Sequence, residues 1–440
     1  MSSTLIRNAA ILTMNDRMEV VEGSVSVRDG RIAAVGAESQ EPHDVTIDAT
    51  GQYLLPGFVQ THIHLCQTLF RGYADDLRLL DWLRTRIWPM EAAHTPASLR
   101  AAARLACLDL LSSGTTSILT METVHGTEAV IEAVAETGMR ATIGKCLMDE
   151  TTPDAPHNLQ EDGRTALAEG VALFRRFHGT AGGRIRVALA PRFALSCSRE
   201  LLEAIAGTAS EIDAIVHTHA SEQQDEVDLV RSVTGQGNIE YLATVGLMSA
   251  RLRVAHCVWV DDRDQSLLAE RGVKVTHCPG SNLKLGSGIA PVPEMRERGI
   301  TVSLGADGAA CNNHLDMFSE MRLAATLQAI RHGPGTLTAR DALWMATRSG
   351  AAALGLEAEI GSVEAGKQAD LILVDASSHR MAPSPDPFSA IVYAAQAGDV
   401  RMTMVGGDVL VKDGSPLHLD AGEIAALARS EAAALARRAL

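Results

Sequence analysis

The stretch that decides the fold is LLPGFVQTHIHL, at residues 54–65. It is an apolar run, a Pro-Gly break, and a second apolar run that ends in His62 and His64. Side chains two residues apart in a strand point to the same face, so both imidazoles project together from the strand's C-terminal end. Two such imidazoles can bind one metal ion from the same side. A His-x-His pair alone is more often two hydrogen-bonded histidines, so this interpretation depends on further ligands downstream.

The sequence after this stretch alternates apolar, strand-like runs with longer amphipathic segments. Such alternation is typical of βα units around a parallel sheet. Eight units close a TIM-type barrel, whereas an open doubly wound sheet would carry a Gly-rich turn after its first strand, and none occurs here. We therefore predict a (β/α)8 barrel with strands at 57–65, 115–120, 140–148, 184–195, 214–219, 252–258, 273–278 and 301–306.

Both ends of the chain look different from this central part. Residues 1–57 contain short strands at 4–14, 24–28 and 31–35 with Gly-containing turns between them. Strand-like runs return at 360–375 and 400–413, and an Ala-rich periodic helix closes the chain at 421–440. We expect a small β-sandwich domain built from 1–57 and 356–440, the second part with the C-terminal helix, around a barrel at 58–355.

The composition sets limits on the partners. The 440 residues are 46% hydrophobic and 21% charged, and the net charge is −15. A balance this acidic argues against nucleic acid and anionic membrane. Seven cysteines without a C-x-x-C motif, no signal peptide and no apolar run of membrane-spanning length predict a reduced, cytoplasmic chain.

Polar side chains cluster at the predicted strand ends, where catalytic residues of TIM barrels lie. Five of the eight strands end in His or Asp: His62 and His64, His217 and His219 with Glu222 after them, His256, His277, and Asp307. One zinc ion takes about four nitrogen or oxygen ligands. His62, His64, one histidine of the fifth strand and Asp307 make such a set.

Several motifs then identify a family resemblance over nearly the whole chain. They are PGFVQTHIH (56–64), HTHASE (217–222), AHC (255–257), HCPGSNLKLGSGIAP (277–291) and LGADGAACNN (304–313). In combination they resemble the amidohydrolase superfamily, in its branch of cytosine, guanine and S-adenosylhomocysteine deaminases and triazine hydrolases. The resemblance implies a hydrolase of carbon–nitrogen bonds other than peptide bonds.

The resemblance also implies roles for single residues. It makes His62, His64, His219 and Asp307 the ligands of one divalent metal ion, zinc in the first place and Fe²⁺ or Mn²⁺ as alternatives. Glu222, His256 and Asp307 are then the catalytic residues that move protons. Binuclear relatives carry a bridging lysine on the fourth strand, and Arg192 in its place implies a mononuclear site.

The substrate is a small heterocycle in either of two interpretations. TLFRGYADDLRLLDWL (68–83) and WPMEAAHT (88–95) resemble 5′-deoxyadenosine, methylthioadenosine and S-adenosylhomocysteine deaminases, which implies substrate contacts of Trp82 and ribose binding by Glu91. A solvated glutamate at a helix end is the alternative for Glu91. Gln67, Arg192 and Phe193 instead resemble guanine deaminases, in which such side chains bind an oxopurine.

The sequence favours 5′-deoxyadenosine-like nucleosides over S-adenosylhomocysteine itself. No arginine follows the third strand, in residues 149–160, to bind the carboxylate of S-adenosylhomocysteine. The rival activities are those of a guanine, pterin or triazine aminohydrolase, and a more distant alternative is a non-catalytic scaffold of the same fold. A homo-oligomer is expected.

Overall fold

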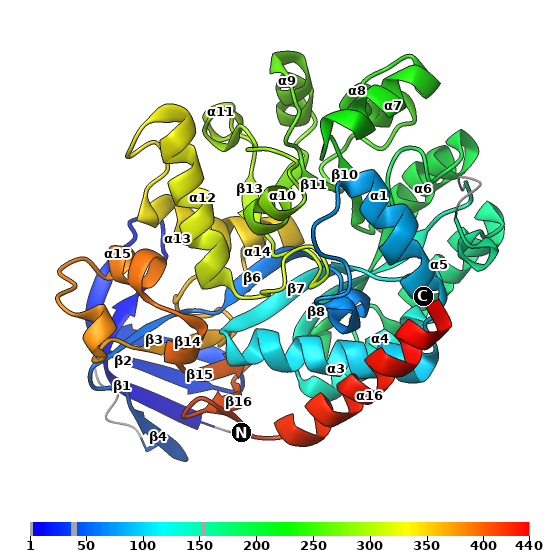
Figure 1. Cartoon of the computed structure of the whole chain (residues 1–440). Helices are drawn as coiled ribbons and strands as arrows, with labels where there is room; N and C mark the ends of the chain where they lie inside the picture. The colour runs from blue at the N-terminus through cyan, green and yellow to red at the C-terminus, as the bar shows by residue number, and fades with distance from the viewer. Residues whose placement is uncertain (1–2, 37–41, 151–154, 440) are drawn as a thin grey trace.

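The structure, a computed structural model, describes residues 3–36, 42–150 and 155–439. It contains two sheets: a parallel sheet of eight strands and a mixed sheet of nine. Figure 1 shows the mixed sheet at one side of the molecule, where blue strands from the N-terminal part lie beside orange and red strands from the C-terminal part. The two sheets confirm the predicted fold class, a barrel with a second β unit built from both chain ends.

The parallel sheet is the barrel, and its strands follow one another in sequence order. Each predicted barrel strand overlaps one of them, because buried parallel strands read as short apolar runs between turns. Their bounds are β6 (Phe58–Ile63), β7 (Thr115–Met121), β8 (Arg140–Leu147), β9 (Ile185–Pro191), β10 (Val216–Ala220), β11 (Leu252–His256), β12 (Lys274–His277) and β13 (Val302–Leu304).

The first and last barrel strands approach each other and bring the metal-ligand candidates together. The hydroxyls of Thr61 and Ser303 lie 2.7 Å apart, and the Asp307 amide donates to the His62 carbonyl at 3.2 Å. A Cβ on Gly305 would lie only 2.6 Å from that carbonyl oxygen. Glycine at 305 therefore allows the backbone of β13 to reach β6 at the catalytic end of the barrel.

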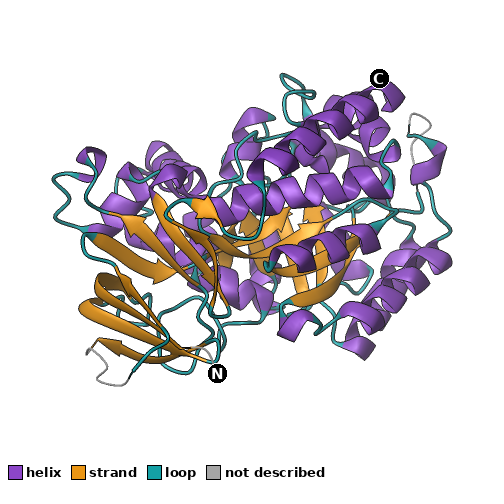
Figure 2. Cartoon of the chain, turned by 90° about the horizontal axis from the view of Figure 1, so that it is seen from below, coloured by secondary structure: helices purple, strands orange, loops and turns teal. Residues whose placement is uncertain are grey.

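Helices surround the barrel strands, as Figure 2 shows from below. They are α1 (Leu79–Trp82), α2 (Trp88–Ala92), α3 (Pro96–Ser112), α4 (Thr127–Thr137), α5 (Gly163–Phe177), α6 (Arg199–Ile212), α7 (Gln224–Thr234), α8 (Asn238–Thr244), α9 (Asp262–Glu270), α10 (Pro279–Lys284), α11 (Val292–Glu297), α12 (Met317–His332), α13 (Ala339–Ala346), α14 (Arg348–Leu354), α15 (Pro387–Ser389) and α16 (Ala421–Ala439). The last of these packs along α3. Among the described residues, no helix combines the length and the apolar character needed to cross a bilayer.

The mixed sheet consists of β1 (Ser3–Leu12), β2 (Val20–Arg28), β3 (Arg31–Gly36), β4 (Val45–Asp48), β5 (Gln52–Pro56), β14 (Leu371–Asp375), β15 (Val400–Val405), β16 (Asp408–Lys412) and β17 (Ser415–Pro416). The link between its two halves is the antiparallel pair β5 and β14. The strand predicted at 360–375 begins only at Leu371, because Gly361 and Gly366 adopt positive φ angles of 88° and 91° that belong to turns.

Candidate active site and metal centre

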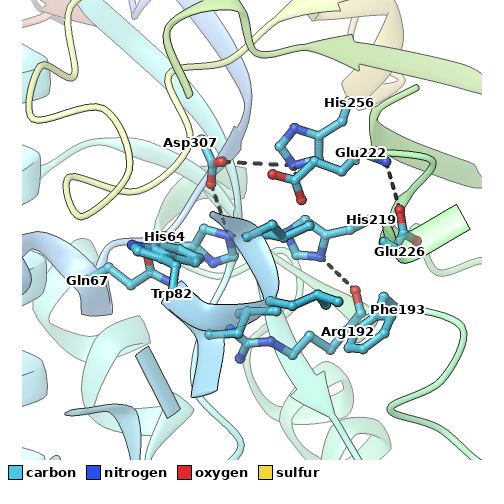
Figure 3. A pocket seen from close by; sticks show the side chains of 13 residues that line it. His64, Gln67, Trp82, Arg192, Phe193, His219, Glu222, Glu226, His256 and Asp307 are labelled. Atoms are coloured by element: carbon cyan, nitrogen blue, oxygen red, sulfur yellow. Dashed lines mark hydrogen bonds and ion pairs between the residues drawn. The ribbon is translucent and has the colours of Figure 1, made fainter. Parts of the chain in front are cut away.

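The strand ends place the predicted ligands around one point. His62 Nε2 and His64 Nε2 each lie 3.2 Å from Asp307 Oδ1, and His219 Nε2 lies 3.3 Å from His64 Nε2. Ligand atoms of His62, His64 and Asp307 all lie within 4.8 Å of one another, and so do those of His62, His219 and His256. Figure 3 shows His64, His219, His256 and Asp307 converging at one end of the pocket.

The other ring nitrogen of each of these histidines has a hydrogen-bond partner in the surrounding protein. His64 Nδ1 donates to the Met121 carbonyl at 2.7 Å, and His219 Nδ1 donates to the Arg192 carbonyl at 2.6 Å. His62 Nδ1 lies 2.7 Å from His217 Nε2, and His217 Nδ1 lies 3.2 Å from the Arg253 carbonyl. These contacts orient each ring so that its Nε2 faces the common centre, as in protein metal sites.

The hydrogen bonding and the protonation of these histidines are those expected of metal ligands. His62 Nε2 and His256 Nε2 are buried and have no hydrogen-bond partner among the described residues. Burial lowers the pKa of His62 to about 4 and that of His219 well below its ordinary value, so both imidazoles are neutral, which is the form that binds metal. Burial opposes protonation of His64 too, but its contacts with Asp307 raise its pKa overall. A divalent cation bound at His64 Nε2 would take the place of the proton that Asp307 stabilises there.

Glu222 and His256 face the same centre from neighbouring strand ends. Glu222 Oε2 lies 3.5 Å from His256 Nε2, and Asp307 Oδ2 lies 3.9 Å from that nitrogen. Burial, together with the charges of Asp307 and Glu226, raises the pKa of Glu222 well above its ordinary value. Glu222 therefore binds a proton more readily than an ordinary carboxylate does.

Three supporting residues of the site carry no sequence prediction. The Glu226 carboxylate accepts the Glu222 amide at 2.8 Å, Asn282 Oδ1 lies 2.9 Å from His256 Nδ1, and the Ser281 hydroxyl donates to Asp307 Oδ2 at 2.7 Å. Ser281 and Asn282 belong to the motif after the seventh strand. The signal for Glu226 would have been its place four residues after Glu222, in the first turn of α7.

The structure shows that Glu91 and Arg192 form a buried ion pair. Arg192 Nη1 and Nη2 lie 2.5 and 3.2 Å from the two Glu91 oxygens, and both residues are 3% exposed. Gln67 Nε2 also donates to Glu91, at 3.0 Å. The alternative of a solvated Glu91 is therefore wrong. Glu91 and Arg192 are partners, although the sequence assigns them to rival substrates, because the tertiary structure brings α2 close to the residue that follows β9.

The pocket above the centre is narrow and mostly apolar. Its lining residues are His64, Gln67, Leu79, Leu80, Trp82, Leu83, Arg192, Phe193, His219, Glu222, Glu226, His256 and Asp307. Its volume is about 40 Å³, room for only a few water molecules. The wall from α1 and the π-helical turn Leu83–Ile87 covers the site, and such turns occur frequently at functional sites. The predicted substrate residues Gln67, Trp82, Arg192 and Phe193 lie in this pocket, and Glu91 lies behind it.

Two further buried residues, Lys145 and His277, lie apart from the ligand set. Lys145 is fully buried and donates to the Val124 carbonyl at 2.6 Å and to Glu161 at 2.9 Å, so it joins the loops after β7 and β8. His277 is also fully buried, and neither of its nitrogens has a hydrogen-bond partner among the described residues. Residues 151–154 of the segment after β8, in which no arginine was found, lie outside the described part of the chain.

The chain is similar over its whole length to known deaminases. The chain is 39% identical over 440 residues to a 5′-deoxyadenosine deaminase from Methanosarcina mazei, with 100% of this chain and 99% of the relative covered. It is 41% identical over 445 residues to a 5-methylthioadenosine/S-adenosylhomocysteine deaminase from Symbiobacterium thermophilum, covering 99% and 100%.

A solved structure agrees: a Xanthomonas campestris adenosine deaminase with bound zinc matches with a TM-score of 0.92 at 32% identity and 99% coverage of both chains. The zinc in that structure and the ligand set described above support a divalent metal ion at this site. The named relatives confirm the prediction of a hydrolase acting on carbon–nitrogen bonds. Residues 53–410 match the model of the amidohydrolase family, and the chain belongs to this family.

Proposed function

We propose that this protein is a metal-dependent hydrolase that deaminates an adenine nucleoside, with 5′-deoxyadenosine as the representative substrate. The observation that carries the proposal is the convergence of Glu222 and His256 on the point that His62, His64 and Asp307 surround. The full-length similarity to two deaminases of such nucleosides supports the choice of substrate class.

The metal proposed is zinc, held by His62, His64, His219 and Asp307. Three neutral imidazoles and one carboxylate are a donor set that zinc accepts. When bound, the ion supplies Lewis-acid chemistry, which lowers the pKa of water and polarises the reacting group. The remaining steps are proton movements made by side chains of the chain itself.

Glu222 is the central proton carrier in this proposal. Its Oε1 is buried without a hydrogen-bond partner among the described residues, so this oxygen is free for water or substrate. Glu222 takes a proton from the attacking water and delivers it to the ring nitrogen next to the carbon that carries the amino group. The raised pKa suits a group that must both accept and release a proton.

His256 and Asp307 complete the transfer. The contact of His256 Nδ1 with Asn282 fixes the ring, and its Nε2 faces Glu222 and Asp307. His256 can thus hydrogen-bond the attacking oxygen or stabilise the charge that develops on it. Asp307 accepts the second proton and passes it to the departing ammonia.

The pocket wall favours an uncharged group at the 5′ position of the nucleoside. Leu79, Leu80, Trp82 and Leu83 present apolar surface on one side. Among the described lining residues Arg192 is the one Lys or Arg side chain, and its guanidinium is already bound to Glu91. A homocysteine carboxylate would find no free partner here, so 5′-deoxyadenosine and methylthioadenosine fit this wall better than S-adenosylhomocysteine.

Gln67 is the polar group that we assign to the substrate. Glu91 holds its Nε2, and its buried Oε1 has no hydrogen-bond partner among the described residues. This carbonyl can accept a hydrogen bond from a ribose hydroxyl. The ion pair of Glu91 and Arg192 then acts by fixing Gln67, with Phe193 and Trp82 beside the ring and sugar.

Substrate entry requires movement of the wall, because a nucleoside is far larger than the present cavity. The short α1 and the π-helical turn after it are the segment that can open, and closure would exclude water from the reaction. Trp82 Nε1 is buried without a hydrogen-bond partner among the described residues and is available to a ligand.

Steady-state ammonia release from a panel of substrates tests this function. The panel is 5′-deoxyadenosine, methylthioadenosine, S-adenosylhomocysteine, adenosine, adenine, guanine and pterin, with Glu222→Gln as the inactive control. We expect the highest kcat/KM for the first two compounds. Turnover of guanine or pterin without turnover of any nucleoside would show that the rival interpretation is right.

A further inference from the structure

A second cavity lies at the other end of the barrel, where the strands begin. Its volume is about 490 Å³, within the range of small-molecule sites. We call it the lower cavity. Its lining residues are Thr142, His178, Arg186, Val187, Asp213, Ile215, Ala250, Arg251, Arg253, Leu354 and Gly355. Residues at this end of a TIM barrel usually contribute to the stability of the fold. A polar cavity at this end therefore needs an explanation.

Arg186 is the first unusual residue of the lower cavity. It is the second residue of β9, two positions before Ala188, which packs against Val59 and Leu119 of other barrel strands. Strand alternation therefore turns Arg186 toward the barrel interior, where apolar residues are the rule. It is partly buried and has no hydrogen bond or ion pair within the part of the chain that the structure describes.

Arg253 is the second unusual residue of the lower cavity. It is 4% exposed, and its guanidinium donates only to backbone carbonyls, from Nε to Ala353 and from Nη1 to Ala250. The Ala353 carbonyl lies at the C-terminal end of α14, so this contact also supports that helix. Nη2 has no partner among the described residues. A buried guanidinium is normally paired with a carboxylate, and here none within the described residues lies in ion-pair range.

Arg186 and Arg253 bring two positive charges to the lower cavity, and the other charged groups around it do not neutralise them. Arg251 is paired with Asp213 at 2.8 Å. His178 Nδ1 accepts the Val187 amide at 3.3 Å, and burial lowers its pKa, so its ring is neutral. Lys274, on the neighbouring strand, donates to the Ala250 and Gly272 carbonyls. The charges of Glu359 and Glu357 act on Arg186 and Arg253, but neither carboxylate forms an ion pair with them among the described residues. Two guanidinium groups without a paired carboxylate thus face one cavity in a protein of net charge −15.

We propose that the lower cavity binds an oxyanion: phosphate, or the phosphate group of a small organic molecule. Guanidinium groups match tetrahedral oxyanions because their N–H donors form a planar fork that can bind two oxygens. An oxyanion would give Arg186 its first partner and would use the free Nη2 of Arg253. The volume of the lower cavity also leaves room for a small organic part attached to the phosphate.

Isothermal titration of the metal-loaded protein with inorganic phosphate, and then with ribose 5-phosphate, tests the proposal in a buffer free of other oxyanions. Arg186→Gln is the main variant, because the side chain supports no described contact and its loss should leave the fold intact. Arg429→Gln on α16 removes the same charge from an exposed position without a hydrogen bond or ion pair among the described residues and is the matched control.

We expect saturable binding near one phosphate per chain, weakened about tenfold or more in Arg186→Gln and unchanged in Arg429→Gln. Tighter binding of ribose 5-phosphate than of phosphate would assign an organic phosphate as the ligand, and equal binding would assign the free anion. Absence of saturable binding overturns the proposal. So does binding that Arg186→Gln leaves unchanged, because the anion then lies elsewhere, for example at the metal centre.

Discussion

The carboxylate of Glu91 and the guanidinium of Arg192, 101 residues apart in the sequence, form a two-point ion pair with N–O distances of 2.5 and 3.2 Å. Burial alone would raise the pKa of Glu91, but Arg192 keeps it below the ordinary value. The same Arg192 accepts the His219 Nδ1–H at its carbonyl oxygen. This pair therefore supports the pocket wall and a metal ligand together.

Removing one member of this pair should harm the protein more than removing both. Glu91→Gln or Arg192→Met leaves the other charge buried, which we expect to cost roughly 3–5 kcal/mol in free energy of unfolding, and the double variant should cost less than either single variant. Denaturant unfolding of the four proteins measures this. Arg100→Met, which removes the surface ion pairs of Arg100 with Glu132 and Glu136, is the control and should cost at most about 1 kcal/mol. Additive losses at positions 91 and 192 would contradict the coupling.

Replacement of His219 and of His217 should have different effects on the metal. His219→Ala removes a ligand, so we expect loss of both metal and activity. His217→Ala removes only the partner of His62 Nδ1, which we expect to weaken metal affinity by roughly 10–100-fold. Elemental analysis and competition with a chelator measure both, and the wild type should hold about one ion per chain. Two ions per chain, or none in active protein, would contradict the mononuclear site.

Glu222→Gln keeps the shape of the side chain but cannot accept a proton. We expect kcat to fall by roughly 10²–10⁴-fold with metal content unchanged. Glu226→Gln is the informative comparison, because Glu226 holds the Glu222 backbone and should affect activity less. Near-normal turnover by Glu222→Gln would refute its role as the proton carrier.

His277 should make the folded state sensitive to acid. Burial lowers its pKa to about 3 in the folded protein, whereas an unfolded histidine titrates near 6.5. Between these values the unfolded chain binds the proton and the folded chain does not, so stability is complete above about pH 6.5 and falls as the pH drops toward 3.

We therefore expect His277→Leu to flatten the dependence of the unfolding free energy on pH, by roughly 3–5 kcal/mol over this window. His418→Leu, at an exposed position, should leave the slope as it is in the wild type. Equal slopes in His277→Leu and the wild type would mean that other groups cause the acid sensitivity.

The wall over the pocket should become more ordered when substrate binds. Amide hydrogen exchange of residues 79–87 should slow on addition of a slowly reacting nucleoside analogue, because closure of α1 over the ligand protects its hydrogen bonds. The helix α13 packs into a different hydrophobic cluster, so it is the internal control and should not respond. Unchanged exchange at 79–87 with a saturating analogue would place the opening segment elsewhere.

The sequence by itself determined the barrel and the residues around its metal centre. Strand and helix periodicities are local properties, so the eight barrel strands could be located from apolar runs and turns. The position of a polar residue at the end of a parallel strand also follows from local sequence, and closure brings all strand ends to one place. His62, His64, His219 and Asp307 converge for this reason, although their roles as ligands stay predictions.

Only the tertiary structure decided which side chains meet across long sequence distances. The pairing of Glu91 with Arg192 depends on how the fold places α2 beside the residue that follows β9. The placement of Ser281 and Asn282 depends on where α10 lies after β12. The same holds for Arg186 and Arg253. In the sequence they are ordinary strand arginines, and only closure of the barrel makes both side chains face the same cavity. Such contacts depend on the summed packing of distant segments, and no local period in the sequence encodes them.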